Sequence, residues 1–527
     1  MSRPEKVQIY DCTLRDGTQG ENISLSVTDK LRIAERLDEF GVHYIEGGWP
    51  GSNPKDAEFF ERAAEMTWKH SKITAFGSTR HWKNPVEEDG NIKALLDART
   101  PAIALVGKSW DFHVHQALGI ELDQNLQIIE ESIAYLKQHG KEVIFDAEHF
   151  FDGYKQNPDY ALQVLRCAAS AGADWVVLCD TNGGSLPSEI AEIARKVTSE
   201  LSSRVGIHCH NDCELGVANS LAAIDAGAEM VQGTMNGYGE RVGNANLTSI
   251  IPNLELKMKC ETVGSERLPG MASLAFFVSE TANVALPNTM PYVGRSAFAH
   301  KGGIHVSAIL KDSRTYEHID PALVGNSRRV LVSDLSGKSN LLYKIQEFGD
   351  INLEQLDLTS LLREIKKLEY DGYQFEGAEA SLKLLVNHFS GGENEPFDVR
   401  GFRVMVDQAV DGTFISEATV KVSVGDGQEH TASDGNGPVN ALDLATKKAL
   451  ARFFPEIEEI HLTDYKVRVL DAKEATAAKV RVLIESTDGN EAWTTIGVST
   501  NVIEASWRAI IDSLLYKIIF RGKATKS

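Results

Sequence analysis

Two histidines separated by one residue are the first candidates for chemistry in this sequence. His208 and His210 lie in the apolar segment 205–210, with Cys209 between them. Alternate residues of a β-strand share a face, so both imidazoles project to one side while the thiol points to the other. Taken alone, the pattern fits half of a metal site or a pair of core histidines equally well.

Two other segments could complete a metal site. Arg15 and Asp16 follow the first apolar segment, and a glycine-rich turn at 240–244 follows the eighth. One carboxylate, two imidazoles and an amide oxygen form a ligand set that suits Mg²⁺, Mn²⁺ or a catalytic Zn²⁺ with open coordination positions. The candidate ligands are therefore Asp16, His208, His210 and Asn244.

Eight short apolar segments recur roughly every 30 residues, and each precedes an amphipathic stretch. They cover residues 7–13, 44–48, 73–77, 102–107, 142–148, 175–180, 205–210 and 230–236. Between them, stretches such as 27–40 and 186–201 carry apolar residues at helical spacing. Eight βα units whose strands are apolar on both faces predict a (β/α)₈ TIM barrel, with a doubly wound open sheet as the alternative.

The predicted barrel locates the chemistry. Active sites of such barrels lie at the carboxyl ends of the strands. Besides the candidate ligands, the polar residues at these ends include Glu46, Lys108, Asp146, Glu148 and Thr181. We therefore expect one site that draws its side chains from several strands.

Composition excludes several classes of partner. The chain has 527 residues and a net charge of -21, and it contains no run of about 18 apolar residues. A strongly acidic protein repels nucleic acid and acidic membranes, so we expect neither as a partner. The six cysteines form no CxxC motif, and no secretory signal is visible at the N-terminus. These features predict a soluble cytoplasmic protein of two or three domains.

The strand rhythm stops after about residue 259. An extension that contains His300 and His305 leads to a glycine-rich linker at 391–396. Beyond it, Ala418–Val422 matches Ala478–Val482, and a second strand and a helix follow each copy. Pattern alone leaves this duplicated part as a structural, dimerising or ligand-binding domain. We predict a barrel domain at 1–265, mainly helical linker subdomains at 266–392, and an α+β domain with a pseudo-two-fold at 393–527.

Three signatures carry a family resemblance. They are Leu14–Gln19 with Lys30, His208–Asp212 with Gly216 and Asn219, and Gly233–Gly237 with Glu240, Arg241, Gly243 and Asn244. With them, nearly the whole chain resembles the 2-isopropylmalate, homocitrate and citramalate synthase family of metal-dependent Claisen-condensing enzymes. The stretches Glu46–Asp56 and Gly107–Asp111 resemble the members that use pyruvate as the acceptor. Glu214 and Asp146 depart from the family, which usually has glycine at the first position and often a small or aromatic residue at the second.

The resemblance implies roles for the candidate residues. Asp16, His208 and His210, with Asn244 as a further ligand, would bind a divalent cation that chelates pyruvate and acts as a Lewis acid. Arg15 would stabilise the charge that develops on the keto oxygen. Glu148 would contact the acceptor or the enolate, and Thr181 would hydrogen-bond the pyruvate carboxylate. The implied reaction condenses acetyl-CoA with pyruvate and then hydrolyses the CoA thioester, as the first step of a threonine-independent route to isoleucine.

A general base must remove a methyl proton from acetyl-CoA. The resemblance implies His305 in partnership with Tyr316, because family members supply the equivalent pair from a second subunit; Glu148 and His300 are the rivals. Histidine suits this role because its pKa lies near neutrality. The resemblance also implies a homodimer or larger homo-oligomer, and feedback inhibition by isoleucine through the C-terminal domain.

Three rival functions stay open from the sequence. A 2-isopropylmalate or homocitrate synthase would need a roomier acceptor pocket. A retro-aldol lyase or a carboxyltransferase shares the barrel and its metal, although a carboxyltransferase should carry a carbamylated lysine. An amino-acid sensor without catalytic activity would not need polar residues at all eight strand ends.

Overall fold

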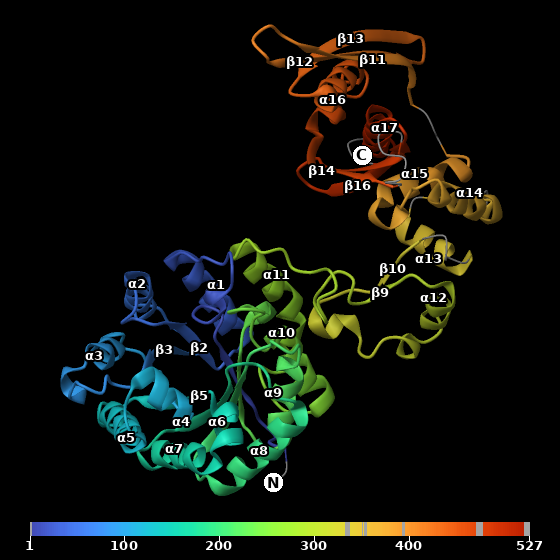
Figure 1. The fold of residues 1–527 in the computed structure, drawn as a ribbon. Helices are drawn as coiled ribbons and strands as arrows, with labels where there is room; N and C mark the ends of the chain where they lie inside the picture. Colours follow the sequence, from blue (N-terminus) through green and yellow to red (C-terminus); the bar gives the residue numbers. More distant parts are fainter. Residues whose placement is uncertain are drawn as a thin grey trace. The chain divides into compact units, whose positions relative to one another are not determined.

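The computed structural model describes residues 3–332, 338–349, 351, 356–392, 396–470 and 478–520. The chain divides into two compact units (Figure 1). The barrel unit comprises Met1–Phe298 with Ile319–Arg328, and the second unit comprises Ala299–His318 with Arg329–Ser527. Within the described residues, no helix has both the length and the apolarity needed to cross a bilayer.

The first unit is a closed barrel of eight parallel strands in sequence order, which confirms the predicted fold class. The strands are β1 (Gln8–Asp11), β2 (Tyr44–Gly48), β3 (Lys72–Ser78), β4 (Ala102–Lys108), β5 (Glu142–Glu148), β6 (Trp175–Asp180), β7 (Arg204–Cys209) and β8 (Met230–Gly233). All eight predicted segments form strands. The first and last strands end earlier than predicted, because the residues that follow them turn away into the loops at the barrel mouth.

Helices surround the barrel, and local sequence explains where they begin and end. Ser26 and Asp29 form a capping box at the start of α1 (Val27–Phe40), and Gly41, at φ 92°, ends it. Pro187 begins α8 (Pro187–Glu200). The other helices of this unit are α2 (Pro54–Ala63), α3 (Gly90–Asp97), α4 (Asp111–His113), α5 (Leu122–Gln138), α6 (Phe150–Gln156), α7 (Pro158–Ser170), α9 (Gly216–Asp225), α10 (Leu247–Pro252) and α11 (Met271–Thr281).

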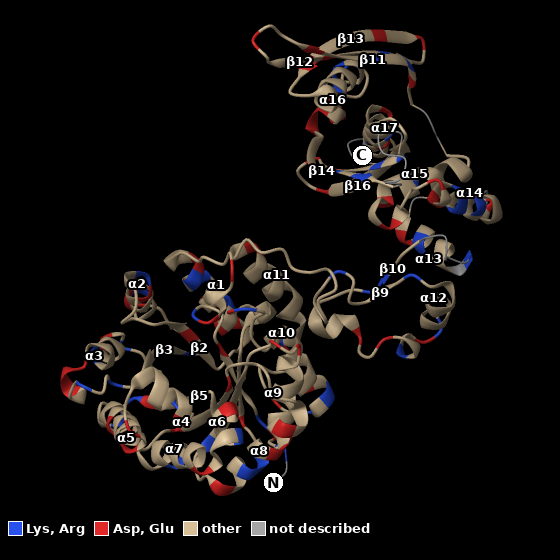
Figure 2. Ribbon diagram, viewed as in Figure 1, with Lys and Arg blue, Asp and Glu red and all other residues tan. Residues whose placement is uncertain are grey.

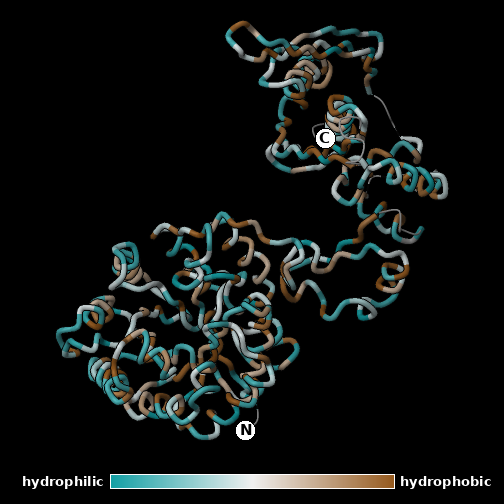
Figure 3. Tube along the Cα trace, in the orientation of Figure 1, coloured by the Kyte–Doolittle hydropathy of each residue, from teal (hydrophilic) through white to brown (hydrophobic). Residues whose placement is uncertain are grey.

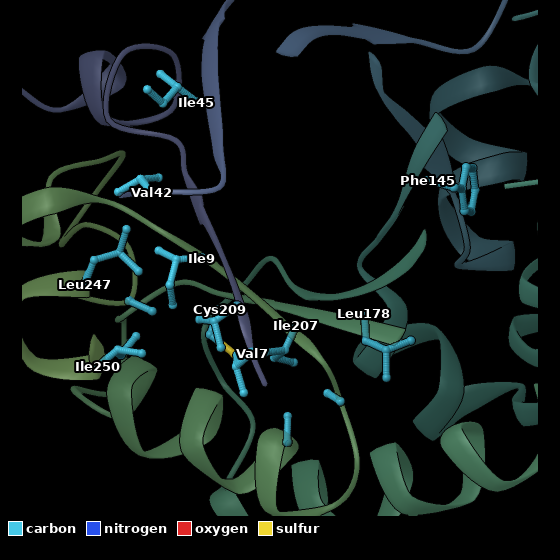
Figure 4. Close-up of a cluster of buried hydrophobic side chains, with 14 of the residues drawn as sticks. Val7, Ile9, Val42, Ile45, Phe145, Leu178, Ile207, Cys209, Leu247 and Ile250 are labelled. Atoms are coloured by element: carbon cyan, nitrogen blue, oxygen red, sulfur yellow. The ribbon is translucent and has the colours of Figure 1, made fainter. Parts of the chain in front are cut away.

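The barrel strands bury both faces. One face packs against the helices, and Figure 4 shows part of this layer, with Ile207 and Cys209 of β7 in it. The opposite face fills the barrel interior with residues such as Tyr10, Phe76 and Trp175. Figure 3 shows hydrophobic colours along much of the barrel strands, and Figure 2 shows most charged residues on the helices and loops. Since Cys209 faces the helices, His208 faces the interior, as the alternation predicted.

The second unit begins with a small helical part. It contains α12 (Gly303–Ile309), the two-stranded sheet of β9 (Ala299–His300) and β10 (Arg329–Val330), α13 (Lys338–Phe348), α14 (Leu358–Tyr370) and α15 (Glu379–Phe389). Apolar residues of α13, α14 and α15 share one core with Ile496 and Val498 of the following module. In the predicted linker, residues 393–395 lie outside the described residues.

The rest of the second unit is a duplicated module. Each copy has three antiparallel strands followed by a helix: β11 (Asp398–Gln408), β12 (Phe414–Val424), β13 (Gly427–Gly435) and α16 (Pro438–Leu450), then β14 (His461–Val469), β15 (Val480–Thr487), β16 (Ala492–Ser499) and α17 (Val502–Phe520). The predicted strand–strand–helix order in each copy is confirmed, and β11 and β14 precede it as strands that the prediction did not include.

The predicted alignment between the two copies is wrong by four residues. Thr431 donates a hydrogen bond to the carbonyl of Ala445, and Thr495 makes the same bond to Ala509. Thr431 pairs with Val420 across the sheet, and Thr495 pairs with Ile484. The copies are therefore related by 64 positions, which matches Ala418–Val422 with 482–486. Strand patterns repeat every two residues, so a slip of four keeps the buried face and cannot be detected from alternation.

Candidate active site

Three predicted ligands converge at the barrel mouth. Asp16, His208 and His210 offer ligand atoms that all lie within 4.8 Å of one another, and the three residues are 3–6% exposed. The Oδ2 atom of Asp16 lies 3.5 Å from Nε2 of His208 and 3.9 Å from Nε2 of His210. Burial alone would raise the pKa of Asp16, but Arg15 and the two imidazoles outweigh burial and lower it. Burial and His208 lower the pKa of His210 to about 4. The carboxylate is thus charged and His210 neutral at pH 7, the forms that bind cations.

The hydrogen bonding of these residues fits a bound cation. Oδ1 of Asp16 and Oδ1 of Asn244 are buried side-chain oxygens without a hydrogen-bond partner. Leaving buried polar atoms unpaired costs free energy, so native structures rarely do it without a ligand or water. Two carboxylate or amide oxygens and two imidazole nitrogens suit a divalent cation that keeps positions open for substrate. Asp16, His208, His210 and Asn244 would hold it.

The outer ring nitrogen of His208 has a specific partner. Nδ1 of His208 lies 3.0 Å from Oε1 of Gln232, and Nε2 of Gln232 donates to Oδ1 of Asp146 at 2.9 Å. Gln232 is fully buried and Asp146 is 4% exposed. Burial, followed by the charge of Glu46, raises the pKa of Asp146 to about 8.

The loop after β8 brings Asn244 to the site. The backbone of Asn244 bridges that of His210, and the amides on either side continue the pairing: Asn211 donates to Gly243, and Ala245 donates to Cys209. Glycine is required in this loop. A Cβ on Gly243, at φ 96°, would lie 1.9 Å from the carbonyl oxygen of Gly237. The glycine-rich turn thus places an amide side chain beside the histidines.

Arg15 is held in place by a buried carboxylate. Its Nε donates to Glu46, which also accepts a 2.6 Å hydrogen bond from the hydroxyl of Tyr10. The guanidinium lies 3.8 Å from the centre of the Phe76 ring. Burial alone would lower the pKa of Arg15, but Glu46 and Asp16 outweigh it and raise that pKa. Arg15 is therefore a fixed cation next to the metal-ligand cluster.

A cavity of about 860 Å³ opens above this cluster and is lined by Arg15, Asp16, His208, His210, Glu148 and Thr181, among others. The Glu148 carboxylate forms an ion pair with Lys108 of the neighbouring strand β4. The hydroxyl of Thr181 accepts a 2.9 Å hydrogen bond from the backbone N–H of His149, so its own proton can be donated to a ligand. The structure thus brings together these six predicted residues, with Asn244 beside His210.

His305 and Tyr316 lie in the second unit. Their rings stack with centroids 4.2 Å apart, and both belong to the segment Ala299–His318. The rival base His300 lies in the same segment, where its Nε2 is 3.2 Å from Glu317. The structure therefore brings the predicted His–Tyr pair together. Its role in the chemistry stays a prediction.

Sequence reasoning gave no role to Gln232, Glu46 and Lys108. Glu46 and Lys108 were noted as polar residues at strand ends and as part of the stretches that carry the resemblance, without a role of their own. Gln232 follows Met230 at a spacing of two in an otherwise apolar strand, and both residues are fully buried. A polar side chain at an interior position of a barrel strand needs a partner, and this was the signal that could have identified it.

Three family models match the chain. Residues 6–273 match the HMGL-like family, residues 292–372 match the homocitrate synthase post-HMGL domain-like family, and residues 376–518 match the LeuA allosteric (dimerisation) domain. The chain is 57% identical to an (R)-citramalate synthase of Aquifex aeolicus over 98% of both chains, and 54% identical to one of Geobacter sulfurreducens over 97% of both.

A probable 2-isopropylmalate synthase of Methanopyrus kandleri is 33% identical, over 96% of this chain and 97% of its own. The rival acceptor chemistry thus belongs to a less similar protein than the two synthases above. The chain belongs to the (R)-citramalate synthase family of HMGL-like barrel enzymes.

Proposed function

We propose that this enzyme condenses acetyl-CoA with pyruvate and hydrolyses the thioester to give (R)-citramalate and CoA. The observation that carries the proposal is the buried cluster of Asp16, His208 and His210 beside Arg15, in a chain 57% identical to an (R)-citramalate synthase. The product makes the reaction a first step toward isoleucine. We place it in the cytoplasm, in accord with six free cysteines.

The chain's own residues bind and polarise the 2-oxo acid. A divalent cation held by Asp16, His208, His210 and Asn244 supplies Lewis-acid chemistry when bound; Mg²⁺, Mn²⁺ and Zn²⁺ all suit the ligands. Arg15, fixed by Glu46, stabilises the negative charge that develops on the keto oxygen. Thr181 donates its free proton to the pyruvate carboxylate. Glu148, paired with Lys108, faces the acceptor or the enolate.

Carbon–carbon bond formation also needs a base for the methyl group of acetyl-CoA. We propose that His305 is the base that removes this proton. Its ring is stacked on that of Tyr316. The ring nitrogens of histidine accept a proton near neutral pH, and Tyr316 restricts the orientation of the ring. His300 is less suited, because Glu317 already lies within hydrogen-bond distance of its Nε2.

Substrate preference tests the proposed reaction. Release of CoA is measured with pyruvate, 2-oxoisovalerate and 2-oxoglutarate, with and without a chelator, and the product is resolved by chiral chromatography. We expect pyruvate to give the highest kcat/KM, a single (R) product and loss of turnover with the chelator. A preference for 2-oxoisovalerate would make the chain a 2-isopropylmalate synthase, and CoA-independent cleavage of a hydroxy acid would make it a lyase.

We also propose three functional parts: a catalytic barrel at 1–265, linker subdomains at 266–392 and a regulatory domain at 393–527. The match to the LeuA allosteric (dimerisation) domain supports regulation and assembly as a homodimer or larger oligomer.

Isoleucine is the proposed effector. Isoleucine should inhibit turnover and slow amide exchange within 396–520, whereas leucine at equal concentration should do neither. Protection confined to the barrel would contradict this assignment, and a monomeric mass in sedimentation would contradict assembly.

A further inference from the structure

We propose that Asp146 is a positioning residue for the metal site: it fixes which end of the Gln232 amide faces His208, and thereby holds His208 in the tautomer that binds a cation. The inference rests on the proposed metal-dependent function and adds a residue to it.

The three side chains form a single buried chain of hydrogen bonds across the barrel interior. Asp146 comes from β5, Gln232 from β8 and His208 from β7. Gln232 donates to Asp146 at 2.9 Å, and its Oε1 lies 3.0 Å from Nδ1 of His208. None of the three is more than 6% exposed. Because these side chains are shielded from bulk water, each end of the amide depends on its protein partner.

The direction of these hydrogen bonds follows from which groups can donate a proton and which can only accept one. In the structure, Oδ1 of Asp146 accepts a hydrogen bond from the NH₂ end of the Gln232 amide. This oxygen can accept in the ionised carboxyl and also in the neutral one, where the other oxygen carries the proton. The carbonyl end then faces His208 and can only accept, which requires a proton on Nδ1. In the neutral imidazole, Nε2 therefore keeps its lone pair, and this is the atom that lies 3.5 Å from Asp16.

A reversed amide would have the opposite effect. Its NH₂ group would donate to Nδ1 of His208, so the proton of the neutral ring would move to Nε2 and occupy the lone pair needed by the cation. Its carbonyl oxygen would also replace the donor that Oδ1 of Asp146 now faces, and two oxygens without a proton between them repel each other. Asp146 thus acts on the metal ligand through Gln232 without contacting the cation.

Metal affinity of purified full-length variants, without substrates, tests this inference. Mn²⁺ is the probe, and competition with a chromophoric chelator gives its Kd. Asp146→Leu, which removes the acceptor, is expected to weaken Mn²⁺ binding about 10- to 100-fold. The matched control is Asp180→Leu, at the end of the next strand. The Asp180 carboxyl group accepts a hydrogen bond from Ser185 and has none with Gln232. The Mn²⁺ affinity of this variant should match that of the unmutated enzyme.

A second substitution separates positioning from damage. In the Asp146→Leu background, Gln232→Glu should restore the affinity to within about 3-fold, because both oxygens of a carboxylate accept from Nδ1 and no amide needs orienting. Unchanged affinity in Asp146→Leu, or lack of rescue in a folded double variant, would overturn the inference.

A measurement on the unmutated enzyme does not depend on any variant folding. Nitrogen-15 NMR of the metal-free enzyme, labelled at histidine and assigned with His208→Gln, should show His208 protonated at Nδ1; protonation at Nε2 would overturn the inference. The proposed function fails separately, if the unmutated enzyme binds no divalent cation or prefers another 2-oxo acid.

Discussion

The barrel unit and the duplicated module differ in how many of their buried polar atoms lack a hydrogen-bond partner. Of the eight buried side-chain polar atoms without a hydrogen-bond partner among the described residues, seven lie in the barrel unit and none lies between 396 and 520. In the module, buried polar groups pair locally: Trp493 donates to Ser513, and Ser513 donates to Ser486. Unpaired atoms cost stability. Three of the seven belong to Asp16, His210 and Asn244, which indicates a site that a ligand completes.

Removing one ligand is the strongest test of that contrast. His210→Ala should lose divalent-cation affinity by more than the 10- to 100-fold that loss of an outer partner costs, and turnover with it. His113→Ala is the matched control, because Nδ1 of His113 is equally buried and unpaired but lies outside the cluster. Titration calorimetry with Mn²⁺ measures the cation affinity of both variants. Equal losses would mean that unpaired atoms do not distinguish the ligands.

Replacing the proposed base tests whether the chemistry extends beyond the barrel unit. His305→Ala should lower kcat about 10²- to 10⁴-fold, because a general base contributes about that much, and it should leave pyruvate binding unchanged. His300→Ala should have a far smaller effect. Steady-state kinetics and pyruvate titration measure the two quantities, and near-normal turnover in His305→Ala would return the role to Glu148.

Burial of Asp146 predicts a pH effect on the metal-free barrel. The folded-state pKa of about 8 lies above the usual aspartate pKa of 3.8. The neutral carboxyl therefore stabilises the fold below about pH 4, and this contribution is lost as the pH rises to about 8. Asp146→Asn cannot ionise. Its free energy of unfolding, relative to the unmutated enzyme, should rise across this window by about 1.4 kcal/mol per unit of pKa difference. Amide exchange of β5 measures it, and a flat difference would contradict the raised pKa.

The duplicated module should instead respond to changes in packing. A Cβ on Gly497 would lie 1.9 Å from the carbonyl oxygen of Ala505, so Gly497→Ala should destabilise the module by roughly 1–3 kcal/mol. Gly437→Ala is the control, because Gly437 has extended backbone at φ -177° and nothing within 4 Å of an added Cβ. Urea unfolding reports the loss, while Mn²⁺ affinity should stay unchanged in both variants.

The smallest expected effect concerns substrate binding. Thr181→Val removes the hydroxyl proposed to donate to pyruvate, and the lost hydrogen bond of roughly 1–1.5 kcal/mol should raise KM for pyruvate about ten-fold. Thr181→Ser keeps the hydroxyl and should stay near the unmutated value. A KM that is equal in both variants would remove Thr181 from the pyruvate site.

Sequence predicted the barrel well because its signal repeats. Eight apolar strands at regular intervals give the closed sheet, and the spacing of His208 and His210 gives their common face. Gln232 was missed because its hydrogen-bond partner Asp146 lies 86 positions away, and no local pattern joins the two. The copies of the module were misaligned by four residues because alternation carries no absolute register. Local periodicity thus predicts elements, whereas pairwise contacts between distant strands require the structure.

A divalent cation bound at the unpaired oxygens of Asp16 and Asn244 would link the folding of this enzyme to the supply of a nutrient ion. A cation that binds only the folded barrel adds to its stability by mass action, and every ten-fold rise in its free concentration above Kd contributes about 1.4 kcal/mol. In a cell starved of the ion, more of the enzyme would unfold and reach the proteases, so its abundance would fall together with its activity.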